Sequence, residues 1–114
     1  MRTIIAGSRE IRDYLLIVQA VENSGFVPTV IISGGARGVD RLGERYGAMH
    51  DIPTRVFLPD WETIGKSAGF VRNRQMALEA DCLIAVWDGK SKGTAHMIKT
   101  AKEYNLDVYI EEVS

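Results

Sequence analysis

The sequence predicts an α/β protein: a single three-layer domain over residues 1–114, in which a mostly parallel sheet of five strands is covered by helices on both faces. Three observations lead to this prediction. Short apolar runs rich in β-branched residues alternate with segments whose apolar residues recur at helical spacing. The short runs are apolar throughout, which is typical of strands buried on both sides. A length of 114 residues is that of one domain.

The first half of the chain contains three of the strands and two of the helices. We expect strands over residues 3–6, 27–32 and 54–58, the last of them set off by Pro53 and Pro59. The first helix ends at Ser24 and Gly25. Its apolar residues are Ile11, Tyr14, Leu15, Val18 and Val21, and those of the second helix are Val39, Leu42, Tyr46 and Met49.

The second half adds two helices and two strands. Residues 60–69 are expected to form a long loop, which leads to a helix over residues 70–80. The most continuous apolar run of the chain follows at residues 82–87, and we therefore expect a central strand there. A further glycine loop, a helix over residues 94–104 and a last strand over residues 108–110 complete the pattern.

Composition and charge exclude several classes of protein. The hydrophobic content of 46% and the charged content of 25% are those of an ordinary globular protein, and a net charge of −1 argues against general attraction to nucleic acid or membranes. The single cysteine, Cys82, rules out a disulfide within the chain, and its apolar neighbours indicate a small buried side chain. No segment approaches the ~20 apolar residues of a membrane span, and residues 1–3 lead straight into a strand rather than a signal peptide, so we expect a cytoplasmic protein.

The stretch over residues 30–40 carries the strongest functional signal. It begins as a buried strand, turns through Gly34, Gly35 and Gly38, and continues into an amphipathic helix. Glycines let the backbone approach a ligand closely, and the free N–H groups of a helix N-terminus attract anions, so the stretch predicts a phosphate site. Its glycine spacing differs from the G-x-G-x-x-G dinucleotide fingerprint. The alternative is a tight strand-to-helix turn in which glycine serves only the backbone geometry.

The carboxyl edge of the sheet gathers the other candidates. Ligands of such sheets bind where the strands end, and every informative loop of this chain follows a strand. Basic side chains are expected to make a local positive funnel there. They are Arg9, Arg37, Lys66, Arg72, Lys90 and Lys92. The candidate ligand-binding residues are Gly7, Ser8, Arg9, Ser33, Gly34, Gly35, Ala36, Arg37, Gly38, Asp40, Trp61, Lys66, Arg72, Trp87, Asp88, Gly93 and Thr94.

Some of these side chains have two interpretations. Asp40 can complement the helix dipole or accept hydrogen bonds from a ribose. Trp61 and Trp87 can each stack on a base, although for Trp87 closing the edge of the sheet is the favoured role. His50 and His96 have no ligand partners nearby in the sequence, so we expect no metal site, and we expect no cofactor.

Four motifs occur along the chain in an order that a known family shares. They are Gly7-Ser8-Arg9, SGGARGVD at residues 33–40, AGFVRNRQM at residues 68–76, and Trp87-Asp88-Gly89 followed by Lys92-Gly93-Thr94. Together they resemble the SLOG superfamily, specifically its small single-domain branch related to YspA and YpsA. The resemblance covers nearly the whole chain and implies a Rossmann-like sheet that binds nucleotides or nucleotide-derived sugars at this edge. It also adds Asn73 to the candidate ligand-binding residues.

The enzymatic relatives in that superfamily are the Lonely-Guy phosphoribohydrolases, which release a base from a nucleoside monophosphate. Their late loop runs P-G-G-x-G-T-x-x-E, and its glutamate is essential for catalysis. Gly93 and Thr94 look like the G-T pair, whereas Met97 stands at the glutamate position; an arginine resembling theirs is present at Arg72 or Arg74. The candidate catalytic residues are Asp40, Asp88 and Arg72, with Glu44 as a further carboxylate that could replace the glutamate.

The resemblance and the residues lead to three functional hypotheses. We expect a protein that binds a nucleotide or a nucleotide-derived molecule, such as a ribose phosphate or an ADP-ribose-like signal, as a sensor, carrier or sink, and that forms a homo-oligomer. The alternative is an N-glycosidic hydrolase related to the phosphoribohydrolases. Single-strand DNA binding, as in the related DNA-processing protein DprA, is less expected because the chain is nearly neutral.

Overall fold

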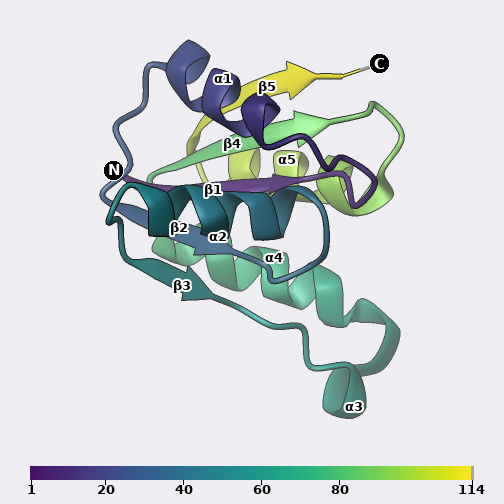
Figure 1. Cartoon of the computed structure of the whole chain (residues 1–114). Helices are drawn as coiled ribbons and strands as arrows, with labels where there is room; N and C mark the ends of the chain where they lie inside the picture. The colour runs from purple at the N-terminus through teal and green to yellow at the C-terminus, as the bar shows by residue number, and fades with distance from the viewer. Residues whose placement is uncertain (114) are drawn as a thin grey trace.

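Five parallel strands form the sheet at the centre of the computed structural model, which describes residues 1–113 (Figure 1). They are β1 (Arg2–Gly7), β2 (Val30–Ser33), β3 (Thr54–Val56), β4 (Cys82–Trp87) and β5 (Asp107–Glu112). The strand order is β3-β2-β1-β4-β5, and each neighbouring pair is parallel. The chain therefore builds the sheet outward from β1 in one direction, then crosses back to β4 and continues in the other.

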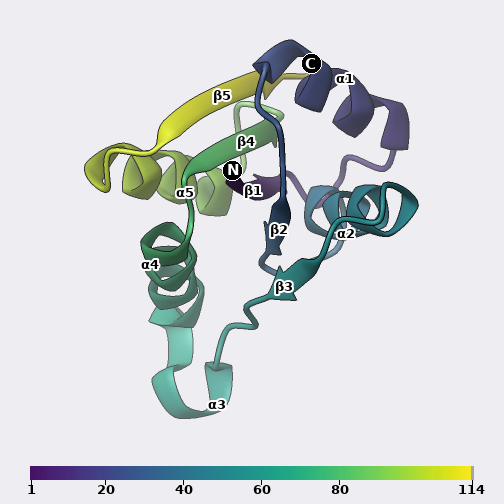
Figure 2. The same ribbon diagram turned by 90° about the vertical axis from the view of Figure 1, so that its left-hand side faces the viewer.

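Helices cover both faces of this sheet, which confirms the predicted three-layer α/β fold (Figure 2). They are α1 (Tyr14–Ser24), α2 (Val39–Met49), α3 (Trp61–Ile64), the 3-10 helix η1 (Gly65–Ser67), α4 (Ala68–Glu79) and α5 (Lys92–Glu103). The strands separate α1 and α2 from α4 and α5, while α3 stands away from the sheet beyond the end of α4 (Figure 2). None of the described helices combines the length and apolar character that crossing a bilayer requires.

The side chains of each inner strand alternate between two hydrophobic cores. Ile4 packs into the core under α4 and α5, whereas its neighbour Ile5 packs into the core under α1 and α2. Leu83 and Ile84 divide in the same way on β4. Because both sides of the inner strands β1 and β4 face a core, residues 4–6 and 82–86 are buried and apolar throughout.

The predicted central strand over residues 82–87 is β4, which lies inside the sheet between β1 and β5. The middle position belongs to β1. Cys82 is a buried free thiol, as expected, and its Sγ lies 3.2 Å from the hydroxyl of Thr3; burial raises the pKa of this thiol.

The predicted apolar stripe of α2 is wrong at Met49, which is 60% exposed. The buried residues of the helix are Val39, Asp40, Gly43 and Gly47, which form the face toward the sheet. A Cβ atom at Gly43 would stand only 2.8 Å from Ile5, so these glycines allow the helix axis to lie unusually close to the strands. Close packing at these glycines, together with Leu42 and Tyr46 against the core under α1, sets the orientation of α2.

Two further expectations need correction. Residues 60–69 are not one long loop: the side chain of Asp60 accepts a hydrogen bond from Thr63 N at 3.1 Å and caps α3, and α4 already begins at Ala68. In α1, Leu15 is 63% exposed, and Ile17 and Ala20 occupy the core instead. The sequence contains enough apolar residues at helical spacing to support either face of α1, and packing against the sheet selects one.

Candidate functional site

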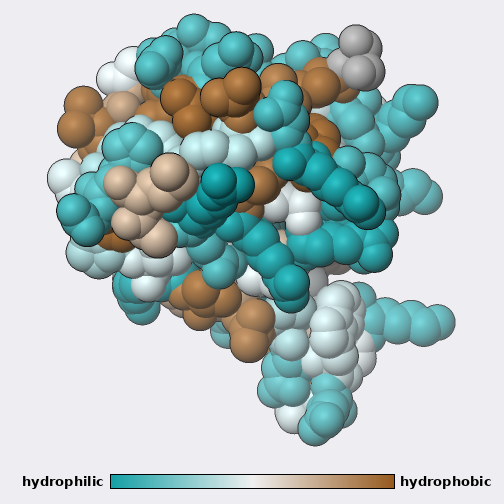
Figure 3. All heavy atoms as spheres, viewed as in Figure 1, coloured by the Kyte–Doolittle hydropathy of each residue, from teal (hydrophilic) through white to brown (hydrophobic). Residues whose placement is uncertain are grey.

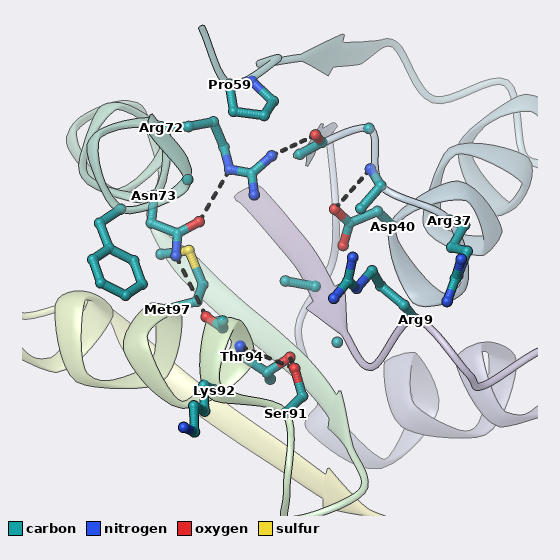
Figure 4. Close-up of a pocket in the computed structure, with 18 of the residues that line it drawn as sticks. Arg9, Arg37, Asp40, Pro59, Arg72, Asn73, Ser91, Lys92, Thr94 and Met97 are labelled. Carbon is teal, nitrogen blue, oxygen red and sulfur yellow. Dashed lines mark hydrogen bonds between the residues drawn. The ribbon is translucent and has the colours of Figure 1, made fainter. Parts of the chain in front are cut away.

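A cleft of about 1010 Å³ opens at the carboxyl ends of β1, β2 and β4, where the strand order reverses. Hydrophilic side chains gather on the side of the molecule where these strands end (Figure 3). Fourteen of the predicted site residues line the cleft (Figure 4). They are Gly7, Arg9, Gly34, Gly35, Ala36, Arg37, Asp40, Trp61, Lys66, Arg72, Asn73, Asp88, Gly93 and Thr94.

The cleft is strongly basic in a protein whose net charge is −1. Seven basic and three acidic side chains line it. Of the ion pairs among the described residues, only that of Arg37 with Glu10, at 2.6 Å, involves the cleft. Arg9, Lys66 and Lys92 therefore have no carboxylate partner within residues 1–113. Unpaired cations around a concave surface attract anionic ligands.

Hydrogen bonds to Ser33 and to side chains of α2 fix the conformation of the glycine loop after β2. The hydroxyl of Ser33 accepts a hydrogen bond from Gly35 N at 3.1 Å and donates one to the Glu44 carboxylate at 2.7 Å. Gly35 and Gly38 have φ values of +73° and +79°, which L side chains rarely adopt. A Cβ at Gly38 would also stand 2.5 Å from the carbonyl oxygen of Ser8, so the loop after β1 and the loop after β2 touch at this glycine.

A buried carboxylate and a half-buried guanidinium both lie beside Gly34 of this loop. Asp40 is only 6% exposed, and its Oδ2 accepts a hydrogen bond from Ala36 N at 3.2 Å. Burial raises its pKa from 3.8 to about 6, against the opposing effects of the Ala36 N–H and the Arg72 charge. Arg72 donates to the carbonyl of Gly34 (Figure 4), and burial lowers its pKa. A Cβ at Gly34 would overlap both side chains, so this glycine is required for the pair to approach the loop.

Asn73 connects this pair to the opposite side of the cleft. Its Oδ1 accepts a hydrogen bond from Arg72 Nε at 3.1 Å, and its Nδ2 donates to the carbonyl of Gly93 at 3.4 Å. The same amide lies 3.1 Å from Nδ1 of His96, whose ring stacks on Phe70 with 4.0 Å between centroids. The amide of Asn73 is buried and fully used, so it fixes the first turn of α5 relative to the glycine loop.

The loop after β4 presents the N-terminus of α5 to the cleft. Asp88 Oδ1 accepts hydrogen bonds from the backbone N–H groups of Lys90 and Ser91 at 2.8 and 2.9 Å, which hold the pKa of Asp88 below its ordinary value. Ser91 caps the helix by accepting from Thr94 N. A Cβ at Gly93 would meet nothing within 4 Å, so the surrounding structure does not require glycine at this position.

Four predicted site residues do not line the cleft but support its loops. Ser8 is buried and its hydroxyl accepts a hydrogen bond from Asp88 N at 2.9 Å. Ser33 and Gly38 shape the loop after β2, as described above. Trp87 packs against the core under α4 and α5, and its Nε1 donates to the carbonyl of Ser91 at 3.1 Å. Glu44, the further carboxylate, is bonded to Ser33 and does not line the cleft.

Several lining residues are absent from the predicted set. They are Ala6, Glu10, Arg41, Leu58, Pro59, Gly69, Phe70, Met76, Lys90, Ser91, Lys92 and Met97. Lys90 and Lys92 were visible as basic residues of the edge, and Ser91 as a polar residue three positions before Thr94, which is an N-cap signal. Within residues 1–113, no three His, Cys, Asp or Glu side chains come together as a metal site would require.

The fold and the site define a class of protein: a parallel α/β domain whose basic, glycine-lined cleft lies where the strand order reverses. The chain belongs to the YspA, cpYpsA-related SLOG family, whose sequence model matches residues 1–63. It is also 30% identical over 116 residues to the Gene 61 protein of Mycobacterium phage D29, covering 94% of this chain and 93% of the phage protein. The match to the family model confirms the resemblance to the SLOG superfamily.

A solved structure has the same fold. The X-ray structure of DNA processing protein A (DprA) from Streptococcus pneumoniae superposes with a TM-score of 0.74 at 17% sequence identity. The match covers 96% of this chain and 49% of the DprA chain, so the chain spans about half the length of that protein.

Proposed function

We propose that the protein binds a nucleotide or a nucleotide-derived phosphorylated molecule in the cleft, as a sensor, carrier or sink. The observation that carries this proposal is the combination of unpaired cations with the exposed first turn of α5. Arg9, Lys66 and Lys92 border the same cleft as the N-terminal turn of α5. No protein atom lies within 4 Å of the position that a Cβ would take at Gly93, so a ligand can approach the backbone of this turn.

Titration calorimetry with AMP and ADP-ribose tests the proposal. Lys92→Ala is compared with Lys99→Ala, because both lysines are exposed residues of α5 and only Lys92 lines the cleft. A charge-assisted contact contributes about 1.5–3 kcal/mol, so we expect Lys92→Ala to weaken binding about 10- to 100-fold. Lys99→Ala should bind as the wild type does. Absence of binding to either compound at millimolar concentration, or equal loss in both variants, would refute the proposal.

Hydrolysis of an N-glycosidic bond is the second candidate, and Asp40 favours it. A buried carboxyl group whose pKa is raised to about 6 inside a cleft has the properties of a general acid or base. Asp88 is less suited because two backbone N–H groups bond to its Oδ1 and hold its pKa below the ordinary value. Met97, which has only a weak acceptor sulfur, lines the cleft where related hydrolases keep their glutamate.

Chromatography of base release from AMP and NAD distinguishes the two candidates. We expect bound but unreacted nucleotide, because Met97 carries no carboxylate and the carboxyl group of Asp40 is buried and bonded to Ala36 N. Multiple turnover that disappears in Asp40→Asn would instead assign a hydrolase.

A homo-oligomer stays a prediction. Val56, Leu58 and Ile64 are 46%, 69% and 39% exposed, and they follow one another along β3 and the segment after it. Self-association would remove these apolar side chains from water, and sedimentation velocity would measure it.

A further inference from the structure

The cleft has two walls of different chemistry. Arg9, Arg37 and Asp40 lie on one side of it, and Arg72 and Pro59 lie on the other, with α4 (Figure 4). Two aromatic side chains, Trp61 of α3 and Phe70 of α4, line the cleft on this second side. The unpaired cation Lys92 borders the cleft from α5.

Both aromatic side chains are exposed at the cleft. Trp61 is 57% exposed and Phe70 is 45% exposed. The indole of Trp61 lies over the first turn of α4, with Cη2 3.5 Å from the position of a Cβ at Gly69. Exposed large apolar side chains grouped in a cleft indicate a surface that a ligand covers.

The ring of Phe70 is held in a defined orientation. It stacks on His96 with an interplanar angle of 16°, and the imidazole is itself held beside the amide of Asn73. Phe70 therefore has one ring face against α5, while it remains 45% exposed at the edge of the cleft. A flat ring that is fixed before binding loses little conformational freedom when a planar ligand stacks on it.

We propose that Phe70 and Trp61 form a subsite for a nucleobase, so that the ligand is a nucleoside phosphate rather than a sugar phosphate without a base. The inference rests on the proposed function, because it needs the phosphate to bind among the cations. A nucleotide combines a flat base that stacks on aromatic rings with a phosphate that pairs with cations, and the cleft offers both kinds of side chain. A cleft of about 1010 Å³ is also of the size that takes one small ligand.

Calorimetry with AMP and ribose 5-phosphate tests the subsite, since the two compounds share the ribose and the phosphate and differ in the base. The wild type should bind AMP about 10-fold or more tightly than ribose 5-phosphate, because stacking of the base on an aromatic side chain adds about this much affinity. Phe70→Leu keeps an apolar side chain but removes the ring and should abolish most of this preference. Phe70→Tyr keeps the ring and should retain it. Leu78→Ala is the control, because Leu78 is a 69% exposed residue of the same helix and does not line the cleft.

The possible results separate the subsite from the function beneath it. Equal affinity of the wild type for both compounds, or an equal loss for both compounds in Phe70→Leu, overturns the nucleobase subsite and leaves phosphate binding intact. Failure of both compounds to bind overturns the proposed function and the subsite together. Phe70-dependent binding of an oligodeoxythymidylate without binding of AMP overturns the proposal of a mononucleotide in favour of a nucleic-acid strand.

Discussion

Asp40→Asn should change the pH dependence of stability. Asp40 is 6% exposed, and its neighbours with charge are Arg72, which favours the ionised carboxylate, and Glu44, which opposes it. Burial raises the pKa of Asp40 from 3.8 to about 6, so the native state binds the proton more tightly than the unfolded chain. Asp40 therefore contributes stability that is fully present below the unfolded pKa and is lost as the pH rises through 6.

The size of the effect follows from the shift. About two pKa units correspond to roughly 3 kcal/mol over the whole titration, of which about half, roughly 1.5 kcal/mol, falls between pH 5 and pH 8. Asparagine cannot titrate. The free energy of unfolding of Asp40→Asn should therefore rise relative to that of the wild type by roughly 1.5 kcal/mol between these two pH values.

Urea unfolding at pH 5, 6, 7 and 8, followed by tryptophan fluorescence, measures this difference. Asp88→Asn is the matched control, because Asp88 is the other aspartate of the cleft and its pKa is lowered. Asp88 stays ionised in the folded and unfolded states over this range, so its difference from the wild type should be flat. A flat difference for Asp40→Asn, or one that falls as the pH rises, would refute the assignment of Asp40 as a buried carboxyl group that resists ionisation.

Two further predictions concern the basic and glycine residues of the cleft. Lys66→Ala should weaken AMP binding more than Arg37→Ala in calorimetry, because Arg37 is already paired with Glu10 at 2.6 Å; the opposite order would contradict the role of unpaired cations. Gly93→Ala should keep the free energy of unfolding within about 1 kcal/mol, since no protein atom lies near the added Cβ. The same Cβ should weaken AMP binding, because it fills the space in which the ligand approaches the backbone. Gly38→Ala should lower stability in the same urea assay, because φ is +79° and a Cβ would meet Ser8; equal stability of the two glycine variants would argue against this distinction.

Much of the fold could be predicted from the sequence because its signals are local. A continuous apolar run such as residues 82–87 is typical of an inner strand of a parallel sheet, and the alternation of strands and helices restricts the topology. The same logic places the loops after the strands at one edge. The sequence therefore predicted that Arg9, Gly34 and Asp40 belong to one region, and the structure brings them to one cleft.

The tertiary structure decided which face of each helix is buried and what lies beside the predicted site. Gly43 and Gly47, which carry no apolar side chain, lie on the buried face of α2 beside Val39 and Asp40, so hydrophobic periodicity could identify only part of this face. The connection of Asn73 to Arg72 and Gly93 joins α4 to α5 across the cleft. Such contacts depend on the distance and angle at which two helices pack, and those are set by the sum of many side-chain volumes along the interface rather than by any short run of sequence.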